Sequence, residues 1–188
     1  LSGLLALPFM DRSPSIRLAA AAGYLLLFQI LFTFTSYGPY LMEHSFDGGP
    51  LGPLSWVFNL LLGTLAYDWL QGGGTRAAIR KALIWGLGLS LMGWFFRMEW
   101  SGIKAFWPFS QYYMTMPYTL YSTGLAFFAF AFFLYVRDIR GFRFPHFDEF
   151  GMNPLVLYIF HILLLETHGE SMDSASHPLW FLTVFAGF

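Results

Sequence analysis

The run LAFFAFAFFLYV, which extends from Leu125 to Val136, is apolar at every position. Within a bilayer every backbone polar group must find its partner inside the protein, so only helices and closed β-barrels can cross it. A barrel strand would alternate apolar and polar residues, and this run does not alternate. The stretch therefore predicts a membrane-spanning helix, and the fold class that we expect is all-α.

The composition of the whole chain points the same way. Of its 188 residues, 56% are hydrophobic, 21% are aromatic and 11% are charged, whereas an average globular protein has roughly 25% charged residues. A soluble domain of this size could not hide so many apolar side chains, so the lipid bilayer is the expected partner. The net charge of −1 gives no reason to expect a nucleic-acid partner. The chain has no cysteine, which excludes disulfides, thiolate ligands and a cysteine nucleophile.

Six apolar stretches are separated by glycine, proline and polar residues. The predicted spans are residues 17–36, 54–70, 79–96, 117–136, 151–166 and 178–188. A span needs about 20 residues, and the last stretch stops short of that number. We expect residues 1–188 to form a single polytopic bundle of about six transmembrane helices, with both ends incomplete.

The basic residues predict the orientation of this bundle. Cytoplasmic loops carry an excess of Lys and Arg. If the first span begins inside, eight basic residues fall on the inner side: Arg12, Arg17, Arg76, Arg80, Lys81, Arg137, Arg140 and Arg143. The outer side receives only Arg97 and Lys104. We therefore expect an integral protein of a bacterial inner membrane.

The polar residues of the fifth predicted span are the candidate site. Asn153 and His161 are eight residues apart, which places them some 80° apart around a helix, and Tyr158 lies between them. Intramembrane polar residues often mark functional sites. His161 could pack against a neighbouring span, line a substrate cavity or ligate a buried cofactor such as a haem or chlorophyll. No His, Asp and Glu spacing matches a zinc pattern, so we expect no metal site.

Three short motifs occur in a characteristic order. They are Asp47-Gly48 and Leu51-Gly52 before Leu62-Gly63, then Trp107-Pro108-Phe109-Ser110 before Tyr118-Thr119, and finally Gly151-Met152-Asn153 followed by Tyr158. Together they resemble segments of the heparan-α-glucosaminide N-acetyltransferase-like family of membrane acyltransferases, over roughly residues 38–168. The chain departs from the family pattern at residues 47–50, where the family's glutamate is absent.

The resemblance implies that this chain corresponds to the C-terminal half of such an enzyme. The family transfers an acetyl group from acetyl-CoA to a glucosamine amine, using an outer-loop histidine that has no counterpart here, so no catalytic residue is assigned. The resemblance implies that Asn153 borders the acyl-donor cavity. The guanidinium groups of Arg137 and Arg140, on the basic side, suit the phosphates of acyl-CoA.

Two classes of function follow from these features. The first is the membrane-embedded half of an acyltransferase. The second is a non-catalytic transmembrane subunit of a larger respiratory or photosynthetic assembly, which retains an acyltransferase-like scaffold and binds other membrane protein subunits. The sequence does not decide whether this chain is an enzyme.

Overall fold

The computed structural model describes residues 1–44, 47–98 and 107–142, and in these residues it is helical without any strand. The expected all-α class is therefore confirmed for this part of the chain. The helices are α1 (Ser2–Met10), α2 (Pro14–Phe34), α3 (Tyr37–His44), the short η1 (Gly49–Leu51), α4 (Gly52–Arg97), α5 (Met116–Leu134) and the π-helical turn η2 (Tyr135–Ile139). The chain divides into two units, Leu1–Gly141 and Phe142–Phe188, and all of these helices belong to the first.

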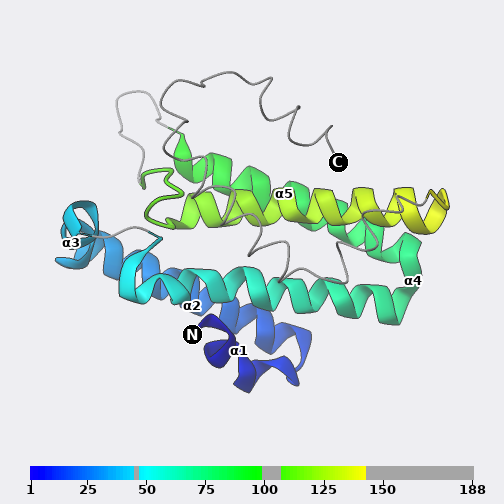
Figure 1. Cartoon of the computed structure of the whole chain (residues 1–188), viewed down its shortest axis with the longest axis horizontal. Coiled ribbons are helices and arrows are strands. Elements are labelled where there is room, and N and C mark those ends of the chain that lie inside the picture. The colour runs from blue at the N-terminus through cyan, green and yellow to red at the C-terminus, as the bar shows by residue number, and fades with distance from the viewer. Residues whose placement is uncertain (45–46, 99–106, 143–188) are drawn as a thin grey trace, which may run out of the picture. The chain divides into compact units, whose positions relative to one another are not determined.

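The helix α4 contains a kink that turns it back on itself (Figure 1). Gly74 has φ 69° and ψ 171°, a conformation that residues with a side chain rarely adopt. The first half of α4 (residues 52–73) and the second half (residues 75–97) contain the predicted spans 54–70 and 79–96. Two predicted spans are thus joined by a single residue with non-helical dihedral angles.

The directions of the helices alternate through the unit. The second half of α4 is antiparallel to α5, because Gly86 lies against Gly124 and Gly93 lies against Pro117. The first half of α4 runs parallel to α5, since Ser55 bonds to Thr119 and Asn59 bonds to Thr123. The helix α2 is antiparallel to the first half of α4, because Arg17 near its start pairs with Asp68 and Phe28 near its end lies against Gly48, just before α4.

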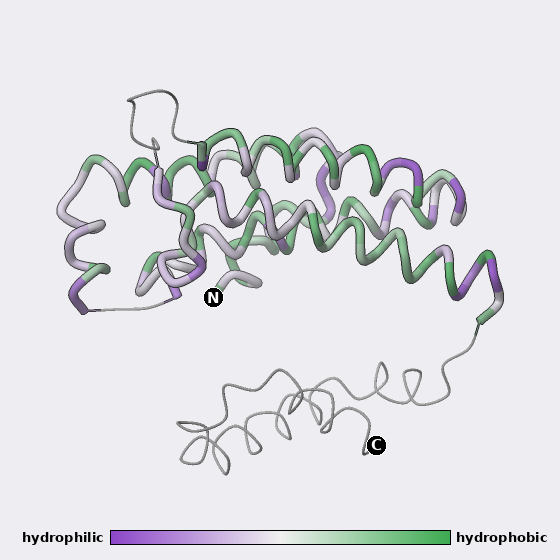
Figure 2. The backbone as a smooth tube through the Cα atoms, turned by 90° about the horizontal axis from the view of Figure 1, so that it is seen from above, coloured by the Kyte–Doolittle hydropathy of each residue, from purple (hydrophilic) through white to green (hydrophobic). Residues whose placement is uncertain are grey.

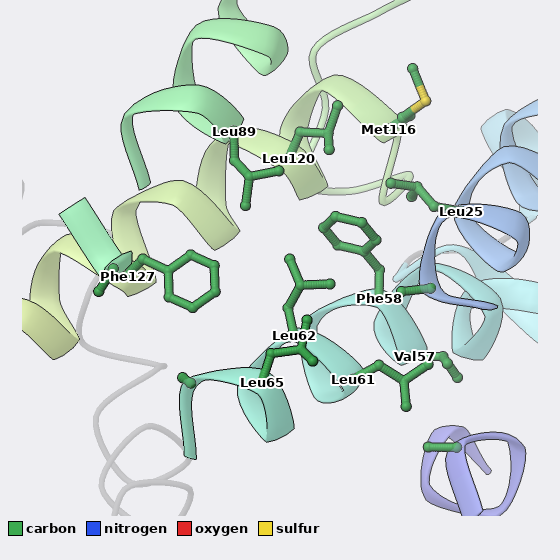
Figure 3. Close-up of a cluster of buried hydrophobic side chains, with 14 of the residues drawn as sticks. Leu25, Val57, Phe58, Leu61, Leu62, Leu65, Leu89, Met116, Leu120 and Phe127 are labelled. Carbon is green, nitrogen blue, oxygen red and sulfur yellow. The ribbon is translucent and has the colours of Figure 1, made fainter. Parts of the chain in front are cut away.

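The core lies between α2, both halves of α4 and α5. Figure 3 shows Phe58 and Leu62 of α4 directed toward α5, with Leu25 of α2 close to Phe58. Phe127 of α5 packs against Trp69, with 5.4 Å between ring centroids, and Trp69 packs against Trp85 of the second half. The two halves of α4 and α5 therefore share one apolar interior.

Two helices are long and apolar enough to cross a membrane by length and composition, Pro14–Phe34 and Met116–Ile139. Only 33% and 39% of their most apolar windows are buried inside the protein. Large apolar side chains on their outer faces are exposed, including Ile30, Phe34, Phe132 and Phe133. Two of the six predicted spans are thus supported by this test. The number six stays a prediction, and the spans 151–166 and 178–188 lie outside the described residues.

Charged residues gather at the two ends of the helices (Figure 2). Because the helices alternate in direction, Arg12, Arg76, Arg80, Lys81, Arg137 and Arg140 lie at the same end. We call this the basic end. The opposite end, which we call the loop end, contains Glu43, Asp47 and Arg97.

A buried arginine ties α2 to α4 near the basic end. Arg17 is 5% exposed, donates a hydrogen bond from Nη1 to Thr64 Oγ1 at 2.9 Å and forms an ion pair with Asp68. An unpaired charge buried among other side chains would be costly, and the pairing offsets that cost. The ion pair with Asp68 therefore joins the start of α2 to the first half of α4.

Because Gly93 lies so close to α5, one methyl group added at this position should lower the stability of the fold. A Cβ at Gly93 would lie 2.6 Å from the carbonyl oxygen of Pro117 and 2.7 Å from the amide nitrogen of Tyr121. We expect Gly93→Ala to lower the free energy of unfolding by about 1–3 kcal/mol, the usual effect of overpacking. Unfolding by SDS titration, followed by circular dichroism, measures this change.

Gly88 provides the matched control, because in the part of the chain that the structure describes a Cβ there meets no atom within 4 Å. Gly88→Ala should leave the stability unchanged or raise it by up to about 1 kcal/mol, since alanine favours a helix over glycine. Equal stabilities of the two variants would contradict the close packing of these helices.

Candidate functional site

The candidate residues from the sequence fall into two groups. Asn153, Tyr158 and His161 lie outside the described residues, and the cavity expected around them stays a prediction. Arg137 lies in η2 and Arg140 directly follows it, and both are exposed. The guanidinium carbon of Arg140 lies 6.0 Å from the ring centroid of Tyr135. Both arginines are thus accessible at the basic end.

Two of the motif-bearing segments pack against each other at the loop end. The backbone N–H of Gly48 donates to the carbonyl oxygen of Tyr112 at 3.4 Å. Ser55 Oγ donates to the carbonyl oxygen of Met114 at 3.0 Å and lies 2.8 Å from Thr119 Oγ1. Residues about 60 positions apart are therefore brought into one hydrogen-bonded cluster, which motif order alone does not require.

This cluster contains an unusual backbone. Asp47 and Met114 are the non-glycine residues with positive φ among the described residues, at 53° and 52°. Gly48 and Gly49 follow Asp47 with φ of 74° and 60°. A left-handed conformation costs a non-glycine residue about 1–3 kcal/mol, and such residues often gather at functional sites. The strain concentrates where the two motif segments meet.

Tyr37 stabilises this strained loop. Its hydroxyl donates to the carbonyl oxygen of Gly48 at 2.6 Å and accepts a hydrogen bond from the backbone N–H of Leu51 at 2.9 Å. The Tyr37 hydroxyl thus links Gly48, which precedes η1, to Leu51, the last residue of η1. Burial raises the pKa of Tyr37 above 10.0, and the N–H of Leu51 partly opposes this shift.

A groove runs from this cluster along the parallel pair formed by the first half of α4 and α5. It has a volume of about 500 Å³, which lies within the range of small-molecule sites. Trp56, Gly63, Tyr67 and Leu70 line the α4 side. Tyr118, Ser122, Ala126, Phe127 and Phe130 line the α5 side, and Met114 lies at the end nearest the cluster.

Asn59 and Thr123 form the polar pair of this groove. Thr123 Oγ1 donates a hydrogen bond to Asn59 Oδ1, and it also donates to the carbonyl oxygen of Thr119 at 2.6 Å. Among the described residues that line the groove there is no carboxylate, imidazole or amine. These walls are mostly apolar and suit the binding of an apolar ligand.

Sequence reasoning did not find this groove. Asn59 stands out as a polar residue inside a predicted span, but its partner is 64 residues away. The groove depends on a parallel contact between helices that are not neighbours in sequence. The small residues Gly63, Ala66 and Ala126 are the sequence feature that could have indicated a groove. Such residues more often mark close packing of helices, so they do not predict an open groove.

Comparisons of the chain with models of protein families, with curated proteins and with solved structures find no match. The acyltransferase resemblance therefore rests on the motif residues alone.

The double hydrogen bond of Tyr37 predicts the effect of removing its hydroxyl. Tyr37→Phe leaves the carbonyl of Gly48 and the N–H of Leu51 without this partner, so we expect the free energy of unfolding to fall by about 1–3 kcal/mol. Because folding raises the pKa of Tyr37, its contribution is complete below pH 10.0 and decreases as the pH rises above that value. The wild-type protein should therefore lose more stability above pH 10.0 than the variant does.

Tyr40→Phe is the control, because Tyr40 is an exposed neighbour on the same helix. SDS unfolding curves at neutral and alkaline pH compare the three proteins. If Tyr37→Phe and Tyr40→Phe unfold alike at neutral pH, Tyr37 does not hold the loop.

Proposed function

We propose that this chain is the membrane-embedded half of an acyltransferase-like protein, which binds acyl-CoA at the basic end and supports transfer of the acyl group to a sugar amine. The observation that carries the proposal is the contact between the two motif segments at the loop end. Residues that resemble separate parts of one enzyme family share a strained, hydrogen-bonded cluster, as the parts of one functional unit would.

The proposal places the protein in a bacterial inner membrane. The basic end faces the cytoplasm, about six helices cross the bilayer, and other membrane subunits or the remaining half of the enzyme complete the assembly. The alternating directions of α2, α4 and α5 support this topology, because they collect the basic residues at one end.

Donor binding is the step in which the described residues take part. Arg137 and Arg140, supported by Arg76, Arg80 and Lys81, hold the phosphates of acyl-CoA through charge-assisted hydrogen bonds. Asn153, Tyr158 and His161 border the acyl-donor cavity. In the transfer, the amine nitrogen forms a bond to the acyl carbon, the bond from that carbon to sulfur breaks, and the amine proton leaves with the CoA thiol.

The topology can be tested with single cysteines, because the chain has none of its own. Gly73→Cys lies at the basic end and Gln111→Cys at the loop end, and both positions are exposed. In intact cells an impermeant maleimide should label the cysteine at position 111 and reach position 73 only after permeabilisation. Labelling of position 73 alone in intact cells would reverse the proposed orientation.

Donor binding can be tested by replacing the two arginines that follow α5. Arg137→Ala combined with Arg140→Ala should weaken binding of CoA by about 1.5–3 kcal/mol per lost charged contact. Isothermal titration calorimetry of the purified protein in detergent measures the affinity. Arg97→Ala, which removes a cation at the loop end, serves as the control and should bind CoA as the wild type does.

Unchanged CoA affinity in the double variant would remove the arginines from the donor site. If the wild-type protein binds neither CoA nor acetyl-CoA, the non-catalytic subunit replaces the enzyme as the better interpretation.

A further inference from the structure

We propose that the groove between the first half of α4 and α5 binds one anionic phospholipid, with an acyl chain along the groove and the phosphate at the basic end. This inference requires that the helices lie in a membrane, but it does not depend on acyl transfer. It concerns an apolar groove that the acyltransferase proposal leaves unused, whereas the basic residues at the end of the groove serve both proposals.

The length of the groove fits a lipid chain. Its lining extends from Trp56 to Leu70 on α4 and from Tyr118 to Phe130 on α5. At 1.5 Å per residue these segments are about 21 Å and 18 Å long. One leaflet of a bilayer contributes about 15 Å of hydrocarbon, so an acyl chain that enters at the basic end can lie in the groove along its whole length.

The walls of the groove fit the same occupant. Gly63 has no side chain, and Ala66 and Ala126 have one methyl group each, so a channel remains between the helices. Thr123 Oγ1 is bonded to Asn59 Oδ1, so a hydrocarbon chain can pass these two oxygens without breaking their hydrogen bond. A polar ligand would leave the apolar walls unmatched.

The open side of the groove gives a lipid a route of entry. Trp56 is 45% exposed and Tyr67 is 62% exposed along this side. Among the described residues this side of the groove is exposed, so in a membrane a lipid chain can enter it sideways. A water-soluble ligand would have to cross lipid to reach the same opening.

Charge selects the headgroup. Beyond Leu70, α4 continues through the kink at Gly74 to Arg76 and Arg80, and beyond Phe130 the helix continues to Arg137. These cations are exposed near the end of the groove where the headgroup would lie. Guanidinium groups suit phosphate, and a net negative headgroup is attracted more strongly than a zwitterionic one.

The proposal is tested by filling the groove without disturbing the helix. An added Cβ at Gly63 meets no atom of the described residues within 4 Å, and the same is true of Gly88, which lies outside the groove. Gly63→Leu therefore fills the groove, and Gly88→Leu is the matched control. Ala126→Leu fills the groove from the α5 side and keeps the test valid if Gly63→Leu fails to fold, as judged by circular dichroism.

The measurement is native mass spectrometry of the detergent-purified protein, titrated with dioleoyl phosphatidylglycerol or dioleoyl phosphatidylcholine. We expect one phosphatidylglycerol to bind at least tenfold more tightly than phosphatidylcholine. Gly63→Leu or Ala126→Leu should weaken that binding at least tenfold, and Gly88→Leu should leave it unchanged. Arg76→Gln combined with Arg80→Gln should reduce the preference for phosphatidylglycerol.

Three results would overturn the proposal. The first is equal binding of the two lipids by the wild type, and the second is unchanged phosphatidylglycerol binding in the folded variants that fill the groove. The third is a lipid-free dimer that Gly63→Leu and Ala126→Leu abolish, because it would assign the groove to a second copy of the chain. The variants at Gly63 and Ala126 fill the groove and leave every arginine in place, so the lipid proposal and the CoA proposal can fail separately.

Discussion

The close approach of α5 to the second half of α4 determines the positions of the other helices in this unit. Gly86, Gly93 and Gly124 allow backbone atoms to meet where any side chain would intervene. In lipid there is no hydrophobic gain from bringing two apolar helices together, so packing contacts and hydrogen bonds must hold them. Once α5 is held in this way, its N-terminus lies against the first half of α4 and the loop end can form.

Buried polar side chains then secure the loop end. Gln29 of α2 is 1% exposed and accepts a hydrogen bond from the backbone N–H of Met116 at 2.8 Å, which satisfies a free donor at the start of α5. Ser55 and Thr119 both bond to the carbonyl oxygen of Met114. The strained φ of Met114 is thus held by partners on two helices. At the basic end, the described residues rely on Arg17, with Thr64 and Asp68, to join α2 to α4.

Much of the helical framework could be predicted from the sequence. Hydropathy alone places a helix over residues 117–136, and the structure has Met116–Leu134 continued by η2. The glycines at 72–74 lie between two predicted spans and are typical of a turn, but they do not predict that a single residue, Gly74, interrupts the helix. The pairing of Arg17 with Asp68 and of Asn59 with Thr123 could not be predicted, because each joins residues more than 50 positions apart. The groove could not be predicted either, because no local sequence pattern indicates that α5 packs against both halves of α4. The remaining candidate residues, Asn153, Tyr158 and His161, lie outside the described part.

Small residues lie on both sides of α5, but they allow close backbone contact on one side and border a groove on the other. The residues that flank them account for this difference. Against the second half of α4, Gly86 and Gly93 face Gly124 and Pro117, and the backbones touch. Against the first half, Gly63 and Ala126 border an open groove. There the contact between Ser55 and Thr119 at one end and the packing of Trp69 on Phe127 toward the other fix the separation of the helices. The helices cannot close onto Gly63 without compressing the rings of Trp69 and Phe127, so the groove stays open between this helix pair.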